Sequence, residues 1–194
     1  RKRGTSIYFL DRVIHMLPER LAAEICSLAP GKDRLALSVF IRLNAAGQQE
    51  GYRIVESVIH SAARLTYSQV QSLFDGRDEA AGSAVEFASE LVDMRKLAAK
   101  RRALRLDRGA LDFALDQPRV EIDDASCPVA LGCHPRWESH RLIEEFMLLA
   151  NECVADYVLR RNLPVLYRVH RPPAPSSMIE LSRLVSSIGV DLGS

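Results

Sequence analysis

One early stretch of the chain alternates strictly between apolar and other residues. Leucine, valine and isoleucine occupy every second position from Leu35 to Leu43, and this period of two predicts a strand with one buried face over residues 34–43. The sequence Asn-Ala-Ala-Gly at 44–47 predicts a turn, after which residues 52–59 return as a second strand. We therefore expect a β-hairpin in the first third of the chain.

The rest of the chain follows mainly the helical period. Helices are expected over residues 18–25, 66–76, 85–108, 136–161 and 178–188. Thr66 and Gln69 have the spacing of a capping box, and the two serines at 176–177 are expected to cap the last helix. Residues 110–122 and 165–169 have the pattern of extended segments. Together these patterns predict an α+β fold, with a hairpin or mixed sheet first and a mainly helical second half.

The composition is typical of a soluble globular protein that forms one domain or a large part of one. The chain has 194 residues, of which 47% are apolar and 26% charged. It lacks the roughly 18 consecutive apolar residues of a membrane helix. It opens on Arg-Lys-Arg without a methionine, which is typical of a cut inside a longer protein. The net charge is +1, and the basic clusters at 96–108 and 160–171 fit either phosphate contacts or solvated helix faces.

The four cysteines match no zinc-ligand spacing. Cys127 and Cys133, which precedes His134, leave a metal site open. Reduced, partly buried thiols in a cytoplasmic protein are the preferred interpretation.

The motifs of self-contained active sites are absent from the sequence: there is no nucleophile elbow, no phosphate-binding glycine loop and no HExxH. Asp123 and Asp124 fit a solvated loop better than a metal site. Glu144 and Glu145 lie in the long apolar helix and diverge by about 100° around its axis. Such carboxylates are solvated, pair with arginine or lysine, or face a ligand channel.

Three aromatic residues border polar segments rather than the middle of apolar helices: Tyr8, Tyr67 and Phe113. Aromatic rings in such places are either packing residues or surfaces on which nucleobases stack. The residues alone leave both interpretations open.

A resemblance to a known family goes further. It is carried by the segments Arg3-Gly4-Thr5-Ser6-Ile7-Tyr8-Phe9, Ala63-Arg64-Leu65-Thr66-Tyr67, Arg108-Gly109-Ala110-Leu111-Asp112-Phe113 and His140-Arg141-Leu142-Ile143-Glu144-Glu145-Phe146-Met147. On these segments the chain resembles the RNB catalytic domain of ribonuclease II/ribonuclease R exoribonucleases, and the ribonuclease R branch fits better. The resemblance covers nearly the whole chain and implies that residues 1–194 are part of one such domain.

The resemblance implies an activity for the parent protein. Members of this family are processive 3′-to-5′ exoribonucleases that hydrolyse single-stranded RNA to nucleoside monophosphates with Mg²⁺. The family's metal-binding aspartates lie upstream of the matched segments, and its Arg-rich phosphate-binding stretch lies downstream. We therefore expect the chain alone to be inactive, to hold no metal ligands and to depend on the remaining polypeptide or a partner chain.

The resemblance also assigns RNA-binding roles. Tyr8 and Phe113 match aromatic residues that bracket the last stacked nucleotides, and Tyr67 matches a further aromatic RNA contact. Glu144 matches a carboxylate that points at the terminal nucleotide, where it accepts a hydrogen bond from a 2′-hydroxyl. Arg136 and His140 lie where the family contacts sugar or phosphate.

The sequence departs from the family pattern at several positions. Leu10 and His15 stand where the family commonly has proline, and Trp137 replaces a small polar residue beside Arg136 and His140. The departure at Trp137 bears directly on the roles implied for its neighbours. Two functions follow: part of an active exoribonuclease, or an inactive fragment that binds RNA or serves as a scaffold.

Overall fold

The computed structural model describes residues 4–112, 117–123, 127–167, 169 and 171–190. The chain divides into two compact units, Arg1–Tyr157 and Val158–Ser194. The described residues form helices and antiparallel hairpins, which confirms the predicted α+β class. Among the described helices, none combines the length with the apolar composition of a membrane span.

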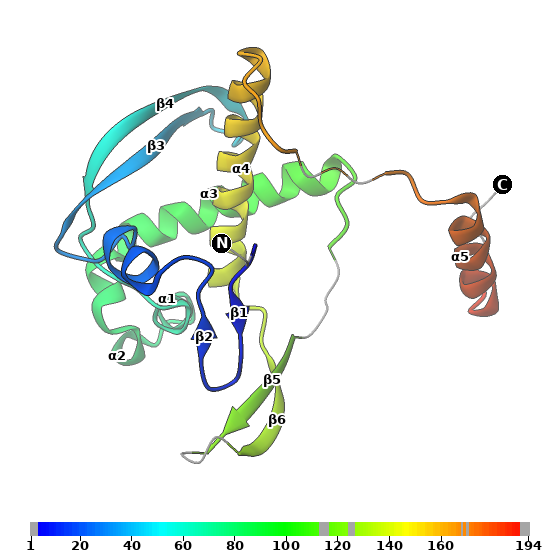
Figure 1. The fold of residues 1–194 in the computed structure, drawn as a ribbon, viewed down its shortest axis with the longest axis horizontal. Coiled ribbons are helices and arrows are strands. Elements are labelled where there is room, and N and C mark those ends of the chain that lie inside the picture. Colours follow the sequence, from blue (N-terminus) through cyan, green and yellow to red (C-terminus); the bar gives the residue numbers. More distant parts are fainter. Residues whose placement is uncertain (1–3, 113–116, 124–126, 168, 170, 191–194) are drawn as a thin grey trace. The chain divides into compact units, whose positions relative to one another are not determined.

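The described strands form antiparallel pairs (Figure 1). They are β1 (Ile7–Tyr8) with β2 (Val13–Ile14), β3 (Asp33–Leu43) with β4 (Gln49–His60), and β5 (Gln117–Ile122) with β6 (Pro128–His134). The predicted hairpin is β3–β4, and its turn is closed by Gly47, whose N–H donates to the Asn44 carbonyl at 2.9 Å. Gly47 has φ 82°, a conformation that favours glycine. The β6 strand was not expected from the sequence.

The predicted buried face of β3 is wrong for half of the strand. Leu35 and Leu37 are 88% and 72% exposed, and Val58, the cross-strand partner of Leu35, is exposed as well. The same face is half-buried farther along at Ile41, whose partner Tyr52 donates its hydroxyl to Asp156 at 2.7 Å. An alternating pattern identifies the apolar face, but burial requires a second layer over it. The described residues supply that layer at only one end.

The helices largely match the periodicity. They are η1 (Arg20–Ile25, a π-helix), α1 (Tyr67–Phe74), α2 (Asp78–Ala81), η2 (Gly82–Phe87, a 3₁₀-helix), α3 (Ala88–Asp107), α4 (Glu138–Arg160) and α5 (Pro175–Ser187). The capping box is confirmed, because Thr66 and Gln69 each bond to the other's backbone N–H. The cap of the last helix is wrong: α5 begins at Pro175, and the N-cap is Ala174. Proline already has the φ of a first helical residue, so the helix begins before the serines.

The strand predicted over residues 165–169 is also wrong for the residues of this segment that the structure describes. Residues 163–167 have no regular structure. A strand needs a neighbouring backbone with which to exchange hydrogen bonds. Within the described part of the chain, this segment has no such neighbour.

The main buried cluster fixes α1 against α2, η2 and α3. Its members are Val70, Ala81, Ala84 and Leu91, with Leu65, Leu73, Phe74, Phe87 and Met94 packed around them. The small alanines let the backbones approach closely. This cluster sets the position of Tyr67, the first residue of α1.

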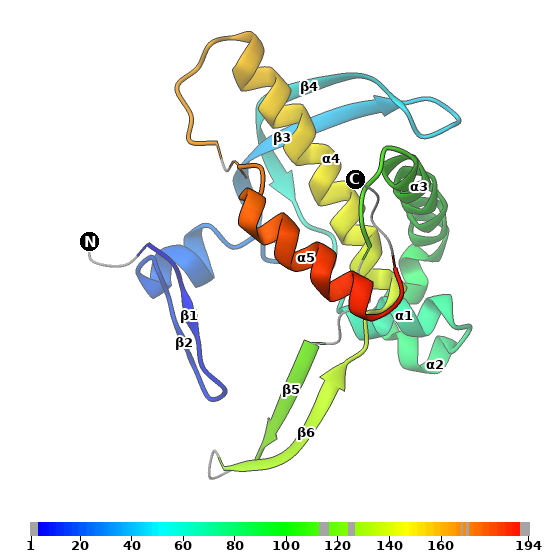
Figure 2. The ribbon, with the colours of Figure 1, turned by 90° about the vertical axis from the view of Figure 1, so that its right-hand side faces the viewer.

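Ion pairs join α3 to α4, two helices that lie next to each other in Figure 2. Arg95 pairs with Glu138 at 2.6 Å, and Arg105 with Glu145 at 2.6 Å. Arg101, which precedes Arg105 on α3, pairs with Glu152 farther along α4 at 3.2 Å. Because Glu138 and Glu145 both lie near the start of α4, their ion pairs fix the first turns of α4 relative to α3.

Candidate nucleic-acid interface

The start of α4 is held against α1 by a buried serine. Ser139 is 2% exposed, its hydroxyl donates to the Tyr67 carbonyl at 3.0 Å, and its N–H donates to the Gln71 side chain at 3.2 Å. The next residue, His140, therefore lies beside Tyr67. One helical turn later, Glu144 occupies the same face of α4 as His140.

Three rings gather at this junction, and we call Tyr67, Trp137 and His140 the aromatic stack. The His140 ring lies 4.2 Å from the Tyr67 ring, with 27° between their planes. It also lies 5.5 Å from the Trp137 ring, at 30°. Tyr67 is exposed, and the other two rings are partly so. Nearly parallel rings at a partly open surface offer faces on which a nucleobase can stack.

A network of ion pairs adjoins the aromatic stack. Asp112 accepts from Arg102 of α3 and from Arg136, the latter at 2.6 Å. Arg136 also donates to Glu144 at 3.0 Å. Arg105 lies 3.6 Å from Glu144 and donates to Glu145 at 2.6 Å. We call Arg102, Asp112, Arg136, Glu144, Arg105 and Glu145 the ion-pair network.

The charges of the network compensate one another. Hydrogen bonds from Arg102 and then Arg136 lower the pKa of Asp112 from 3.8 to about 2. The hydrogen bond to Glu145 raises the pKa of Arg105, and those to Glu144 and Asp112 raise the pKa of Arg136. The network contains three arginines and three carboxylates, so its formal charges are equal in number and opposite in sign. The network carries no net charge.

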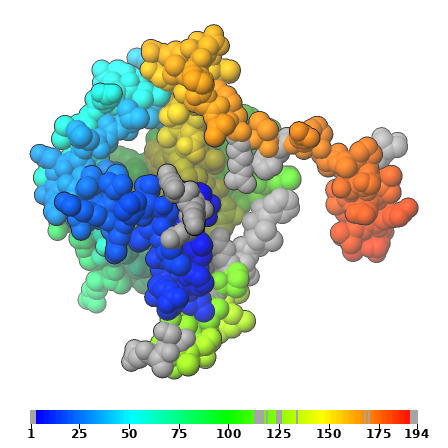
Figure 3. All heavy atoms as spheres, in the orientation of Figure 1, coloured from blue at the N-terminus to red at the C-terminus, as the bar shows by residue number. Residues whose placement is uncertain are grey.

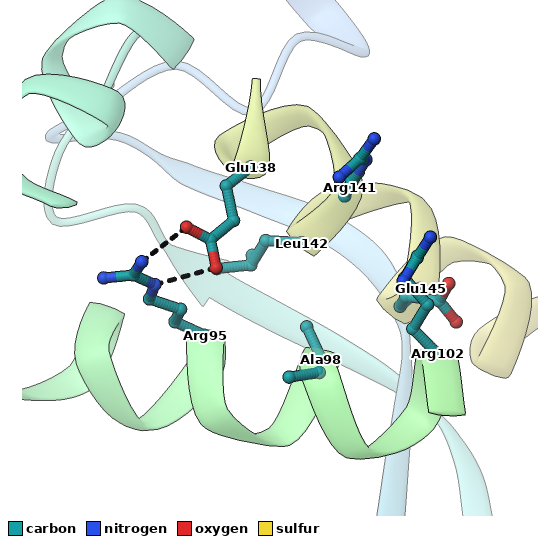
Figure 4. A pocket seen from close by; sticks show the side chains of 8 residues that line it. Arg95, Ala98, Arg102, Glu138, Arg141, Leu142 and Glu145 are labelled. Atoms are coloured by element: carbon teal, nitrogen blue, oxygen red, sulfur yellow. Dashed lines mark hydrogen bonds and ion pairs between the residues drawn. The ribbon is translucent and has the colours of Figure 1, made fainter. Parts of the chain in front are cut away.

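A pocket of about 260 Å³ lies between α3 and α4 (Figure 4). Arg95, bonded to Glu138 at 2.8 Å, lies at one end, and Arg102 and Glu145 lie at the other. Ala98 and Leu142 form part of its wall. The pocket therefore borders the ion-pair network on the side of α3.

The described residues do not fit a divalent metal site. Among them, no three histidine, cysteine or acidic residues are grouped so that they could hold an ion. Asp112, Glu144 and Glu145 are each paired with an arginine. Three neighbouring guanidinium groups would repel Mg²⁺. Of the other acidic pair considered, Asp123 accepts from the Cys127 N–H at 2.9 Å, and Asp124 lies outside the described residues.

The structure brings together four of the six predicted RNA-binding residues: Tyr67, Arg136, His140 and Glu144. Tyr8 lies apart on β1, is 77% exposed, and belongs to the N-terminal segment on the near face in Figure 3. Phe113 lies outside the described residues.

Sequence reasoning missed the residues that support the predicted ones. In the sequence, Asp112 appears only within the segment 108–113, and Arg102 and Arg105 only within the basic cluster at 96–108. The one signal for Glu145 was its place near the apolar stripe of α4, where a buried carboxylate requires a partner. The sequence could not identify that partner, because α3 and α4 are separated by the β5–β6 hairpin.

Sequence comparisons identify one family, and solved structures share the fold. The RNB domain family matches residues 1–192. Ribonuclease R of Aquifex aeolicus is 38% identical over 188 residues, which cover 97% of this chain and 27% of that protein. Mycoplasma genitalium RNase R, solved in complex with ribose methylated single-stranded RNA, has a TM-score of 0.85 at 24% identity, covering 98% of this chain and 30% of that one. Yeast Ssd1, a pseudonuclease, has a TM-score of 0.72 at 19% identity, covering 100% and 23%.

Proposed function

Because the chain belongs to the RNB domain family, as a ribonuclease R-like member, we propose that it forms part of the RNA-binding channel of a processive 3′-to-5′ exoribonuclease. That enzyme would hydrolyse single-stranded RNA to nucleoside monophosphates in the cytoplasm. The chain spans 27% of the length of the Aquifex relative, so the activity is proposed for the protein that contains these residues. The observation that carries the proposal is the aromatic stack beside Glu144.

Each part of the site has a role in this proposal. The rings of Tyr67, Trp137 and His140 offer stacking faces to any base, which suits binding without sequence preference. Glu144 is partly exposed, so its carboxylate can accept a hydrogen bond from a ribose 2′-hydroxyl. The 2′-hydroxyl is the group that distinguishes RNA from DNA. Tyr8 and Phe113 complete the channel as the resemblance implies.

Hydrolysis is not assigned to the described residues. In this family's chemistry, bound Mg²⁺ supplies an activated water and stabilises charge on the phosphate. Asp112, Glu144 and Glu145 are each paired with an arginine and are therefore poorly suited to hold Mg²⁺. We expect the 194-residue chain to release no nucleotides from single-stranded RNA with Mg²⁺. Steady release that co-purifies with the chain would contradict this.

The alternative function is binding without chemistry. The likeness to Ssd1 shows that this fold also occurs in a pseudonuclease. Both functions require RNA to contact the aromatic stack. They differ in whether the protein that contains the chain releases nucleoside monophosphates, which thin-layer chromatography of labelled RNA measures.

Trp137 provides a direct test of the interface, because it is the only tryptophan in the chain. Single-stranded RNA should quench its fluorescence with saturation, and an abasic strand of equal length should quench it much less. Tyr67→Ala should weaken RNA binding, whereas Tyr167→Ala, at an exposed tyrosine in the other unit, should not. Equal quenching by the abasic strand, or no quenching, would remove base stacking from the proposal.

Phe113 requires a separate test. If its ring stacks on a base, Phe113→Ala should weaken RNA binding by about 1–3 kcal/mol and leave stability nearly unchanged. If it is a core residue, the same change should cost about 3–5 kcal/mol of stability. A lower melting temperature with unchanged RNA affinity per folded molecule would identify Phe113 as a core residue rather than a stacking residue.

A further inference from the structure

We propose that Arg136 and Asp112 are positioning residues that orient Glu144, and that Arg136 does not act as a phosphate contact. This inference rests on the proposed function, in which Glu144 accepts a hydrogen bond from the RNA ribose. It assigns to Asp112 a role that the family resemblance did not give it. It also changes the role expected for Arg136, from sugar or phosphate contact to structural link.

The bonds of Arg136 carry the first step. Its Nη1 donates to Asp112 at 2.6 Å and its Nη2 donates to Glu144 at 3.0 Å. Both terminal nitrogens are thus engaged by carboxylates from two different segments. A phosphate at Arg136 would have to share the guanidinium with two carboxylates that are already bonded to it and that repel a further anion. The guanidinium is better suited to bridging the two acids than to binding RNA.

Asp112 anchors this bridge to the scaffold. Its side chain is 15% exposed and accepts a second bond from Arg102 of α3. The position of Arg136 is therefore fixed relative to α3 rather than by its own loop. Asp112 also directly precedes Phe113 in the sequence. Its two ion pairs therefore fix the backbone next to a second residue that is predicted to stack on RNA.

Glu144 is held from two sides. Its Oε2 accepts from Arg136 at 3.0 Å, and its Oε1 lies 3.6 Å from Arg105. Arg105 is itself fixed by Glu145, which is 4% exposed. A carboxylate has about four acceptor positions, so Glu144 keeps capacity for a hydroxyl donor after these contacts. A fixed orientation with spare acceptor capacity is what selective recognition of a 2′-hydroxyl needs.

The test compares single-stranded RNA with DNA of the same sequence at several salt concentrations. It uses the chain and its Asp112→Asn, Arg136→Gln and Arg136→Lys variants. The control is Arg108→Gln, an arginine that pairs with Glu152 outside the network. If Arg136 positions Glu144, the ratio of RNA affinity to DNA affinity should fall about tenfold in both Arg136 variants and in Asp112→Asn. The salt slope of log K should not change, and the control should keep the preference.

The opposite result has a distinct signature. If Arg136 contacts a phosphate, Arg136→Gln should lower the salt slope by about 0.7 and weaken RNA and DNA alike. Arg136→Lys should then retain binding, because an ammonium neutralises a phosphate but cannot bridge two carboxylates as a guanidinium does. Either observation overturns the inference, as does an unchanged RNA preference in Asp112→Asn that remains folded by circular dichroism. A wild-type chain that binds RNA without any preference over DNA overturns it as well, while leaving stacking intact. No RNA binding by the wild-type chain overturns the proposed function with it.

Discussion

The ion pair between Arg105 and Glu145 should be an unequal one, in which removing the arginine costs more than removing the acid. Arg105 donates to Glu145 at 2.6 and 3.0 Å. Glu145 is almost fully buried, and Arg105 is its only described cation partner. Arg105 has a second carboxylate, Glu144, at 3.6 Å. When this ion pair is broken, Arg105 therefore keeps a carboxylate partner, whereas Glu145 keeps no described cation partner.

The magnitudes follow from what each substitution leaves behind. Breaking a buried ion pair from one side typically costs about 3–5 kcal/mol, because a charge remains without compensation. Arg105→Met leaves Glu145 in that state, so we expect a loss of about 4 kcal/mol. Glu145→Met leaves Arg105 with Glu144, so the loss should be about 2 kcal/mol. The double substitution leaves neither charge and should lie within about 1 kcal/mol of the wild-type chain.

Urea denaturation followed by Trp137 fluorescence measures all three free energies of unfolding. Arg108→Met is the matched control, because Arg108 is exposed and pairs with Glu152 at the surface, where an ion pair contributes little. Equal losses for the two single substitutions would refute the reasoning. So would a double variant as unstable as Arg105→Met, because the cost would then come from packing rather than from an isolated charge.

Three further predictions concern other parts of the chain. Burial raises the pKa of the Cys153 thiol, so a thiol reagent should modify the exposed cysteines quickly and Cys153 only on unfolding, as mass spectrometry will show. The folded-state pKa of Asp112 is depressed, so its stabilising contribution is present above about pH 4 and is lost as the pH falls toward 2. Asp112→Asn should therefore make the free energy of unfolding less dependent on pH between about pH 4 and 2. The exposed apolar face of β3 should drive self-association, which Leu37→Lys should reduce in sedimentation velocity while Phe40→Lys, on the opposite face of the strand, reduces it less.

Local patterns predicted the elements well where local interactions decide them. The Thr66–Gln69 capping box, the turn ending at Gly47 and the long α4 helix all depend on residues close in sequence. The β6 strand was missed because its pairing with β5 is what defines it. The failure at Leu35 has a similar cause, since an apolar face is buried only where another layer covers it.

The candidate site shows the same division. The resemblance assigned Tyr67, His140 and Glu144 separately to RNA contacts, and the structure brings these three residues together. Periodicity alone could not assign a partner to Glu145, because that partner, Arg105, lies on a helix 40 residues earlier. Ion pairs between distant segments depend on tertiary packing, and packing is not encoded in any short window.

The basic cluster at 96–108 shows why charge along a sequence is a poor guide to RNA contacts in this chain. Each of its members donates to an acceptor within the protein: Lys96 to Asp93, Lys100 to the Ala45 carbonyl, Arg101 and Arg108 to Glu152, Arg102 to Asp112, and Arg105 to Glu145. Arg101, Arg102 and Arg105 link α3 to other segments, whereas Lys96 and Arg108 form exposed ion pairs. Bonding within the protein is therefore a role that neither interpretation of the cluster from the sequence included. With the ion-pair network neutral, this surface should contribute little to the salt dependence of RNA binding. Affinity here must then come from stacking, which favours a flexible single strand over a duplex whose bases are already stacked, and from hydrogen bonds to the ribose, which favour RNA over DNA.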